Sequence, residues 1–547
     1  MNQLRALPAA LLLASALSAQ STPLELAATP LRSGTELVVR IGGGRTGEPF
    51  ALCADALAGS TVFPGGARLE LALSPAFAVL ATGRFDASGV AFLVLPVPRD
   101  PALHRAACHL QALGVASSSG LVRTSPRLDA RIEPVNAAFV PAWSSAPARR
   151  VVALVHDATQ SAAANGARLH TAMQALQPGD ALVVGAGRWS LEARVDLGLR
   201  GSAGAPIRIL VAPGARPVLT RSNASQNLVN VGDWQSARFL VLRGFELTGG
   251  SAGLRIYEAE DLWIDGCLVH DLGESGITTN SGDTARVYLT GNEVHSTGGS
   301  GEGFYLGANG GLYAMRDSVI ARNYVHDTQL GTTQGDGIEL KQGSYGNLIA
   351  ENLVRHTRYP CILVYGTGGR ARNRIEGNVC IGSLDVVMQV QGEAYVRNNL
   401  LIDGTYGFLS RDHQGVVSQL EVVHNTIVNR GPGAYLRNWG SKPGMVFANN
   451  AVYSRDTLAV EFASGSLGVQ CAGNVHLGNL LGAPGGFTPG SSLADFQGLS
   501  WTASSIDARP SGGSALLDRG AAPFRLPFDL LGQARPAAPD AGCWERL

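Results

Sequence analysis

The stretches SVIARNYVHD (residues 318–327) and NLIAENLVRH (residues 347–356) share the pattern that decides the fold of this chain. Each contains an apolar run, a charged residue, an asparagine and a second short apolar run. The asparagines that recur in this setting are Asn292, Asn323, Asn352, Asn378, Asn399, Asn425, Asn450 and Asn474. The intervals between them are 31, 29, 26, 21, 26, 25 and 24 residues, and a period of this length is typical of proteins built from stacked repeats.

This repeat predicts a parallel β-helix. Each unit has short β-rich runs and no helical period, so it buries its apolar residues only by stacking on its neighbours. Asparagine suits the turn because it tolerates a left-handed backbone and its amide can bond the equivalent asparagine one coil away. A β-propeller or an array of β-sandwiches would need antiparallel hairpins, and the sequence lacks evenly spaced two-residue Asn-Gly or Asp-Gly turns. We expect about nine to eleven coils.

The net charge and the N-terminal residues limit which partners and which cellular compartment we expect. The 547 residues carry 43 basic and 43 acidic side chains, so no overall field attracts nucleic acid or anionic lipid. Residues 1–19 read as a secretory signal peptide, with Arg5 before a short apolar stretch and small residues at the end. No later apolar run is long enough to span a bilayer. We therefore expect a secreted, extracellular or periplasmic monomer without a membrane span.

The chain divides into five predicted parts. Residues 21–133 have short alternating runs without the asparagine repeat and predict a β-sandwich module. The Pro/Ala/Ser-rich residues 134–150 predict a linker. Residues 151–480 form the expected β-helix, with a helix at 161–180 covering its open end. With the signal peptide as the first part, residues 481–547 form the last, an expected C-terminal capping segment.

All seven cysteines follow the predicted signal peptide. An extracellular location permits disulfides, and an odd number leaves at least one thiol unpaired. The pairs we expect are Cys53 with Cys108 and Cys471 with Cys543.

The third strand of each coil is the candidate functional surface. Each predicted coil has an apolar strand, the asparagine turn, a second short strand, a long polar loop and a third strand. In DGIELK (residues 336–341) the inward Ile338 and Leu340 place Glu339 and Lys341 on the outer face. The same register predicts an outward polar column of Lys341, Tyr365, Gln389 and Arg411. The alternative is an ordinary solvated face, but the long preceding loops at 296–302 and 327–336 favour function.

These side chains suit the cleavage of a uronic-acid polymer by β-elimination. A base must remove a weakly acidic proton beside a carboxylate, and a cation must neutralise that carboxylate. We predict Lys341 as the base, with Tyr365 or Arg411 as the acid or charge stabiliser. The oxygen ligands that we predict for Ca²⁺ are Glu302, Asp336 and Glu339.

A histidine column has two interpretations. His270, His295 and His326 occupy equivalent places on consecutive coils, and Arg355 follows on the next. As a functional feature these side chains hold an anionic sugar beside the groove, and as a structural feature they form an outward ladder of stacked rings. A zinc site is disfavoured because imidazoles in one straight column do not converge tetrahedrally. The complete predicted substrate-binding set is His295, His326, Arg355, Gln389 and His413.

The phrases QPGDALVVGAGRWS (residues 177–190) and SAGAPIRILVAPGARPV (residues 202–218) resemble the opening coils of right-handed parallel β-helix polysaccharide lyases of the pectate lyase-like superfamily. The likeness is to the chondroitinase B and alginate lyase branch and covers about 151–480. It implies a substrate groove along the third strands, with Lys341 matching the family lysine and Asp336 a preceding acid. The sequence departs from the family where Tyr365 and its neighbours replace an Arg-His-Gly motif, and where Gln334 replaces an acid.

Three functions remain open at this stage. The leading hypothesis is a lyase that cleaves acidic polysaccharide. A non-catalytic carbohydrate-binding or cell-surface solenoid is the first alternative. A glycoside hydrolase is the second, since Asp336 with Asp385 or Asp412 offers a pair of carboxyls, although the motifs of polygalacturonase-like hydrolases are missing from the sequence.

Overall fold

The computed structural model describes residues 22–63, 66–115, 120–328 and 333–546. The predicted signal peptide therefore lies outside the described residues. Within the described part of the chain, no helix is long and apolar enough to cross a membrane. The chain forms two compact units, one comprising the N-terminal part up to Thr159 together with Ala175–Gly187 and Arg200–Pro217, and the other comprising the remainder.

The predicted N-terminal sandwich of antiparallel sheets is confirmed. Its strands are β1 (Glu25–Ala28), β2 (Glu36–Gly42), β3 (Pro49–Asp55), β4 (Ala58–Val62), β5 (Arg68–Leu71), β6 (Ala78–Arg84), β7 (Ala91–Pro96), β8 (Ala107–Val115), β9 (Val122–Thr124) and β10 (Leu128–Arg131). One sheet has the order β1-β2-β7 and another β10-β8-β3-β6. Leu37, Ile41, Leu52 and Leu110 are among the buried residues of the core between them. Alternating apolar side chains thus build this module, as the sequence pattern indicates.

The same unit contains the first strands of the solenoid. β11 (Arg150–Leu154), β12 (Asp180–Val184) and β14 (Ile207–Val211) pair in parallel in this order. The segment 134–150 forms two short 3-10 turns, Ala137–Phe139 and Ala142–Ser145, with Trp143 buried.

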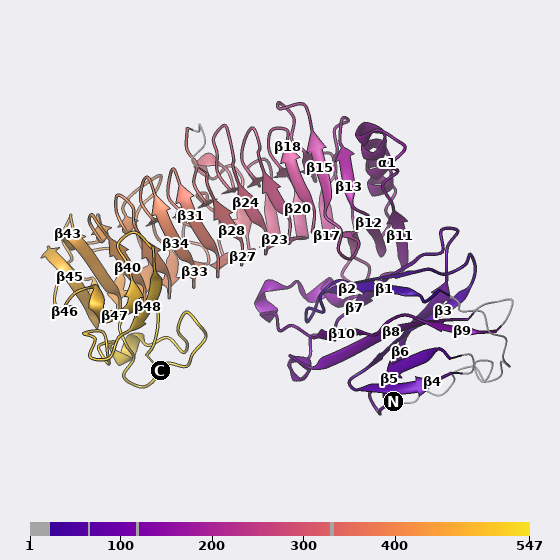
Figure 1. Ribbon diagram of the computed structural model, residues 1–547. Helices are drawn as coiled ribbons and strands as arrows, with labels where there is room; N and C mark the ends of the chain where they lie inside the picture. The colour runs from indigo at the N-terminus through magenta and orange to yellow at the C-terminus, as the bar shows by residue number, and fades with distance from the viewer. Residues whose placement is uncertain (1–21, 64–65, 116–119, 329–332, 547) are drawn as a thin grey trace. The chain divides into compact units, whose positions relative to one another are not determined.

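Together with these first strands, the later strands up to β46 coil into a right-handed parallel β-solenoid of about 12 turns, whose stacked coils are visible in Figure 1. The first strands of successive coils are β17 (Ala237–Arg243), β20 (Ala259–Asp265), β23 (Thr284–Thr290) with β26 (Met315–Arg316), β27 (Val319–Ala321), β30 (Leu348–Ala350), β33 (Asn373–Glu376), β36 (Ala394–Arg397), β39 (Leu420–Val423), β42 (Val446–Ala448) and β44 (Gln470–Ala472). The second strands are β13 (Gly187–Ser190), β15 (Pro217–Arg221), β18 (Glu246–Gly249), β21 (Leu268–His270), β24 (Glu293–His295), β28 (Tyr324–His326), β31 (Leu353–Thr357), β34 (Val379–Ser383), β37 (Leu400–Ile402), β40 (Thr426–Asn429), β43 (Ala451–Phe462), β45 (Asn474–Leu481) and β46 (Phe487–Pro489). The third strands are β16 (Val229–Val231), β19 (Leu254–Ile256), β22 (Ile277–Thr278), β25 (Phe304–Leu306), β29 (Ile338–Leu340), β32 (Ile362–Val364), β35 (Met388–Val390), β38 (Phe408–Ser410) and β41 (Ala434–Leu436). The number of turns is slightly above the nine to eleven coils expected from the sequence.

The solenoid contains the helix expected at 161–180. Helix α1 (Ala162–Gln174) buries Leu169 and Met173 and ends before Pro178. Gly166 of this helix packs so closely on the Ser190 carbonyl that a Cβ atom there would lie 1.8 Å from its oxygen. Only glycine therefore fits at this contact.

The repeated asparagines form one continuous, buried ladder. The Oδ1 atom of Asn352 accepts hydrogen bonds from the backbone N–H and the side-chain amide of Asn323, both at 3.0 Å. Asn352 in turn donates from Nδ2 to the carbonyl of Ile320 at 2.9 Å and to Oδ1 of Asn378 at 2.9 Å. Asn352 thereby satisfies polar groups of the coil before it and of the coil after it.

The left-handed residue of this turn precedes the asparagine. Arg322, Glu351 and Asn398 have φ of 57°, 53° and 54°, and each stands directly before a ladder asparagine. The prediction that the asparagine itself adopts this conformation was therefore wrong. Its place in the ladder rests on the amide group.

The C-terminal segment packs on the last coils. β47 (Phe496–Leu499) and β48 (Ile506–Pro510) form a small antiparallel sheet. Cys543 donates its backbone N–H to Oγ1 of Thr426 at 3.0 Å, and the backbone N–H of Ala521 donates to Oδ1 of Asn449 at 2.7 Å. Tyr453 and Ala541 belong to one apolar cluster there.

All seven cysteines, which lie in the described residues, are free thiols. The expected Cys53–Cys108 and Cys471–Cys543 pairs were therefore wrong. The spacing of the cysteines alone does not show which thiols the fold brings close enough to bond.

Replacing Asn352 by alanine is expected to destabilise the solenoid. The substitution removes both amide donors and leaves the buried Ile320 carbonyl without the partner it has here, so we expect the free energy of unfolding to fall by about 2–4 kcal/mol. Denaturant unfolding followed by circular dichroism measures this loss. Asn223→Ala, in an exposed turn, is the matched control, and equal stability of the two variants would contradict the structural role of the ladder.

Candidate functional site

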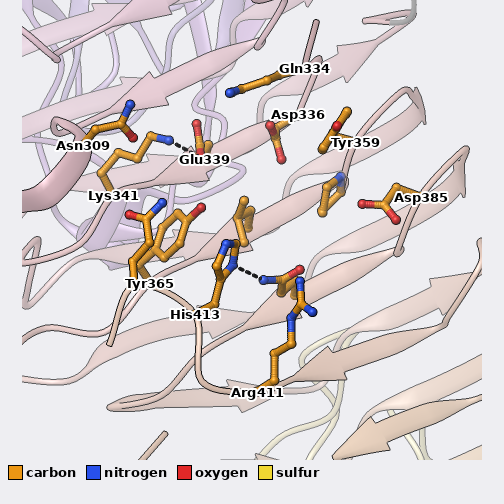
Figure 2. Close-up of a pocket in the computed structure, with 14 residues that line it drawn as sticks. Asn309, Gln334, Asp336, Glu339, Lys341, Tyr359, Tyr365, Asp385, Arg411 and His413 are labelled. Atoms are coloured by element: carbon orange, nitrogen blue, oxygen red, sulfur yellow. Dashed lines mark hydrogen bonds and ion pairs between the residues drawn. The ribbon is translucent and has the colours of Figure 1, made fainter. Parts of the chain in front are cut away.

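A pocket lies on the outer face of the third strands (Figure 2). The loops before β29, β32 and β35 border one side of it, and the turns after β25, β29, β32 and β38 border the other. Its lining residues include Asn309, Gln334, Asp336, Glu339, Lys341, Tyr359, Tyr365, Asp385, Gln389, Arg411 and His413. The pocket therefore combines acidic, basic and aromatic side chains from several coils.

Strand pairing defines the floor of this pocket. Glu339 of β29 pairs with Tyr305 on the preceding coil and with Leu363 on the next. Gln389 of β35 pairs with Leu363. These four side chains therefore follow one another along the central position of the third strands.

A second column borders the pocket at the ends of the same strands. Lys341, Tyr365 and Arg411 each follow the last residue of a third strand. Gln389 was predicted in this column, but Gln391 occupies that register. The error is one of phase, because VVMQVQ (residues 386–391) lacks the glycine that marks the start of other third strands. Gln389 still lines the pocket from its floor.

Lys341 is held inside the pocket rather than in solvent. Its residue exposure is 2%, and its Nζ atom lies 2.5 Å from Oε1 of Glu339. The ammonium group also lies over two aromatic rings, 4.5 Å from the centroid of Tyr305 and 5.4 Å from that of Tyr365. Negative ring faces and a carboxylate thus surround this cation.

Lysine is unusually rare in this chain. Lys341 and Lys442 are the only two lysines among 43 basic residues. An amine can lose its proton at an enzyme's working pH, whereas a guanidinium cannot. This scarcity is a sequence signal that singles out Lys341.

Three buried carboxylates lie together beside Lys341. A ligand oxygen from each of Glu302, Asp336 and Glu339 lies within 4.8 Å of the others. Oε1 of Glu302, Oδ1 of Asp336 and Oε2 of Glu339 have no hydrogen-bond partner among the described residues. Such oxygens are costly to bury unpaired, and calcium or magnesium ions take oxygen ligands of this kind. The residues therefore fit a divalent cation.

Burial and mutual repulsion give this cluster a high proton affinity. Burial, with the charges of Glu339 and Glu302, holds the pKa of Asp336 well above its ordinary value. Burial also raises the pKa of Glu339 to about 7, against the opposing effect of Lys341. Near neutral pH the cluster therefore takes up protons or a cation.

Arg411 and His413 form the opposite wall. Arg411 is exposed, and His413 is half-buried with its Nδ1 atom 2.8 Å from Nε2 of Gln389 (Figure 2). Burial, Arg411 and Lys341 lower the pKa of His413. Its imidazole is therefore neutral near pH 7 and available for hydrogen bonding.

The tyrosines at the pocket remain protonated. Burial, followed by the charge of Glu339, raises the pKa of both Tyr305 and Tyr365. Each is therefore a hydroxyl donor rather than a base. Tyr305 was not predicted as a site residue, although its place in EGFYLG (residues 302–307) matches that of Glu339 in the next third strand.

The histidine column lies on the second strands and does not line the pocket. The ring centroids of His270 and His295 are 5.0 Å apart and those of His295 and His326 are 4.7 Å apart, with stacked planes. Arg355 continues the column beyond His326. His295, His326 and Arg355 therefore do not line this pocket, because the long loops separate the second strands from the third. Their role in substrate binding stays a prediction.

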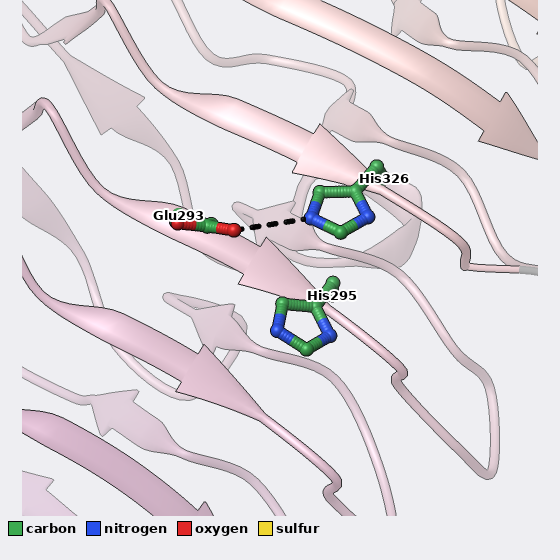
Figure 3. A group of neighbouring side chains, drawn as sticks. All are labelled: Glu293, His295 and His326. Carbon is green, nitrogen blue, oxygen red and sulfur yellow. Dashed lines mark hydrogen bonds and ion pairs between the residues drawn. The ribbon is translucent and has the colours of Figure 1, made fainter.

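Glu293 lies close to two of these rings, because one ligand atom from each of Glu293, His295 and His326 lies within 4.8 Å of the others (Figure 3). Its Oε1 lies 3.4 Å from Nε2 of His326, whose Nδ1 lies 2.7 Å from Oδ2 of Asp327. The Nδ1 atom of His295 lies 3.0 Å from the hydroxyl of Ser296, and burial with its two histidine neighbours lowers its pKa. Parallel stacked rings direct their nitrogen lone pairs side by side, so this arrangement suits a ladder better than a metal site.

Comparison with known proteins gives a match for the coils. A family model described as a right handed beta helix region matches residues 220–380. No curated protein sequence matches the chain.

Several solved structures are similar at low identity. Pectate lyase Pel9A is 15% identical with a TM-score of 0.46, over 73% of this chain and 97% of that one. An alginate lyase from Paenibacillus sp. str. FPU-7 is 17% identical with a TM-score of 0.36, over 62% and 98%. The catalytic domain of a GH87 alpha-1,3-glucanase is 12% identical with a TM-score of 0.34, over 84% and 88%. The parallel strand pairings, together with the family-model match over residues 220–380, show that this part of the chain has a right-handed parallel β-helix fold.

Proposed function

We propose that this protein is an extracellular, monomeric polysaccharide lyase that cleaves an acidic, uronate-containing polymer by β-elimination. The observation that carries the proposal is the buried amine of Lys341, held in a pocket between Glu339 and the faces of two tyrosines. An amine so placed can act as the base that removes the proton next to the sugar carboxylate.

The acidic cluster explains how Lys341 becomes a base. With all three carboxylates ionised and Lys341 protonated, the group of Glu302, Asp336, Glu339 and Lys341 has a formal charge of −2. Glu302, Asp336 and Glu339 would hold a divalent cation such as Ca²⁺, which would balance this charge and supply electrostatic stabilisation of the substrate carboxylate. Lys341, paired with Glu339 at the edge of this cluster, would then lie next to a positive charge, which favours its neutral amine.

The other pocket residues suit the remaining tasks. Tyr365 carries a hydroxyl that stays protonated, so it can donate a proton to the leaving oxygen. Arg411 and His413 line the same pocket and can bind the sugar carboxylate or the developing negative charge. Gln389 holds the His413 ring through its side-chain amide.

One observation favours hydrolysis as a second candidate. Asp336 and Asp385 both line the pocket, and the raised pKa of Asp336 suits a general acid. A hydrolase would release saturated reducing ends. A lyase creates an unsaturated product that absorbs in the ultraviolet, and a non-catalytic binder releases neither.

A direct assay separates these functions. The protein is incubated with alginate, pectate and chondroitin, with CaCl₂ or with EDTA, while ultraviolet absorbance and reducing ends are followed together. We expect both signals to rise on at least one polymer. Reducing ends without absorbance would show hydrolysis, and neither signal with retained retardation in polysaccharide gels would leave only binding.

Replacing Lys341 by arginine is expected to abolish elimination. Arginine keeps the positive charge but cannot lose its proton, so kcat should fall by at least about 10²–10⁴-fold. Lys442→Arg, at the other lysine of the chain, should leave kcat unchanged. Normal activity of a correctly folded Lys341→Arg variant would refute the assignment of the base.

Cation binding is expected to strengthen as pH rises. The pKa of Glu339 lies at about 7 instead of 4.5, so between these values the folded protein binds more protons than the unfolded chain. The contribution of this group to stability is therefore present at low pH and lost as pH rises through about 7.

Added CaCl₂ should reverse this loss, because a cation binds the ionised carboxylates. Thermal unfolding with CaCl₂ or EDTA should show a large cation-dependent rise in Tm at about pH 8 and little at about pH 5. Glu339→Gln should reduce the rise at the higher pH, while Glu351→Gln, at an exposed acid on the solenoid, should not. A rise that is equal in the two variants would exclude the acidic cluster as the cation site.

A further inference from the structure

Trp234 is a highly exposed aromatic side chain on the solenoid. It is 72% exposed, whereas Trp189, Trp263 and Trp439 are fully buried. It lies in the turn between β16 and β17, with polar neighbours in sequence. An indole this exposed, with polar neighbours in sequence, suits stacking on a small flat partner such as a sugar ring.

The turn holds this ring in a defined place. The two carboxylate oxygens of the buried Asp196 accept hydrogen bonds from the backbone N–H groups of Asp233 and Trp234, each at 3.0 Å. The guanidinium of Arg194 lies 5.1 Å from the ring centroid and forms an ion pair with Asp233. The indole is therefore positioned before any partner binds, which lowers the entropic cost of binding.

Trp234 lies on the same edge of the solenoid as Lys341. Gly232 directly follows the third strand β16, just as Lys341 directly follows the third strand β29, so the two residues occupy equivalent positions in their coils. Trp234 lies two residues after Gly232. The third strands β16, β19, β22, β25 and β29 are successive neighbours in parallel. Four strand spacings of about 4.8 Å place the two turns roughly 19 Å apart along the axis.

The side chain of an arginine lies between them along the solenoid. Arg255 is the central, outward residue of β19, between the inward Leu254 and Ile256. Its buried Nε atom has no hydrogen-bond partner, and its guanidinium makes no ion pair with the described residues. It pairs through the backbone with Asn230 on one side and Thr278 on the other, so it belongs to the central column that continues to Tyr305 and Glu339. A guanidinium binds carboxylate or sulfate groups in bidentate fashion.

We propose that Trp234 and Arg255 form a distal subsite for an acidic sugar of the same polymer whose reacting unit occupies the pocket. The indole stacks on the C–H face of a pyranose ring, and Arg255 pairs with the carboxylate or sulfate of that unit or of its neighbour. A pyranose unit in an extended chain is about as long as one strand spacing, so the subsite lies roughly four units from Lys341. This inference rests on the proposed function and makes the protein selective for long chains.

The test compares Trp234→Ala and Arg255→Gln with wild type on polymers and on trisaccharides of alginate, pectate and chondroitin. For the polymer that is cleaved, each substitution should raise KM by about three- to tenfold with kcat unchanged. Trisaccharide kinetics should not change, because a trisaccharide in the pocket does not reach the subsite. Leu467→Ala, at an apolar residue 78% exposed elsewhere, and Arg238→Gln, at an exposed arginine of β17, are the controls.

A binding measurement separates failure of this inference from failure of the proposed function. In the Lys341→Arg background, retardation by polysaccharide gels should weaken when Trp234 or Arg255 is replaced. If no polymer is cleaved by wild type but Trp234→Ala weakens retardation, the subsite stands and the lyase fails. If cleavage occurs and neither substitution changes KM or retardation, the subsite is overturned.

Discussion

The stacking of coils through buried asparagine amides is the constraint on which the rest of this structure depends. Each side-chain amide bonds the next asparagine and a carbonyl of the preceding coil, so the turns on that side are held at one spacing and in one register. Burial makes the constraint strict, because a coil that slipped would leave several amides and carbonyls unpaired away from water. Burial of the apolar residues inside the coils drives folding. It specifies the register of one coil on the next less strictly than the asparagine amides do.

Because the register is fixed, residues at equivalent positions of successive coils lie one above another in a column. Glu339 lies in β29 and Lys341 directly follows that strand, whereas Tyr365 follows β32 on the next coil, more than twenty residues later in the chain. All three side chains nevertheless line one pocket. Stacking also brings like charges together, as in the acidic cluster of Glu302, Asp336 and Glu339. Burial and repulsion raise the pKa values of Asp336 and Glu339, which means that the ionised cluster opposes folding. Lys341 offsets part of this cost without removing it.

The fold was largely predictable because the asparagine spacing defines the phase of each coil. Phase alone located β29 and β32, and with them Lys341 and Tyr365. It did not locate Gln389, whose strand lacks a glycine marker, or the distance between second and third strands that keeps His326 out of the pocket. A second amide ladder, in which Asn347 bonds Asn373 at 3.0 Å, was also missed, since two members make no visible period. These features depend on loop lengths and strand pairing that a one-dimensional pattern does not contain.

The geometry of the solenoid also explains why its candidate site suits a polymer. Parallel third strands repeat every 4.8 Å or so along the axis, close to the repeat of an extended chain of sugar rings. Equivalent positions on successive coils would therefore meet successive sugars of a bound chain, and each coil is free to present a different side chain. Around Glu339 the central column presents a carboxylate, whereas on β19 it presents the guanidinium of Arg255, and the exposed indole of Trp234 lies in the turn after β16. A compact globular enzyme must assemble such an extended surface from unrelated loops, while here it follows from repetition with local variation.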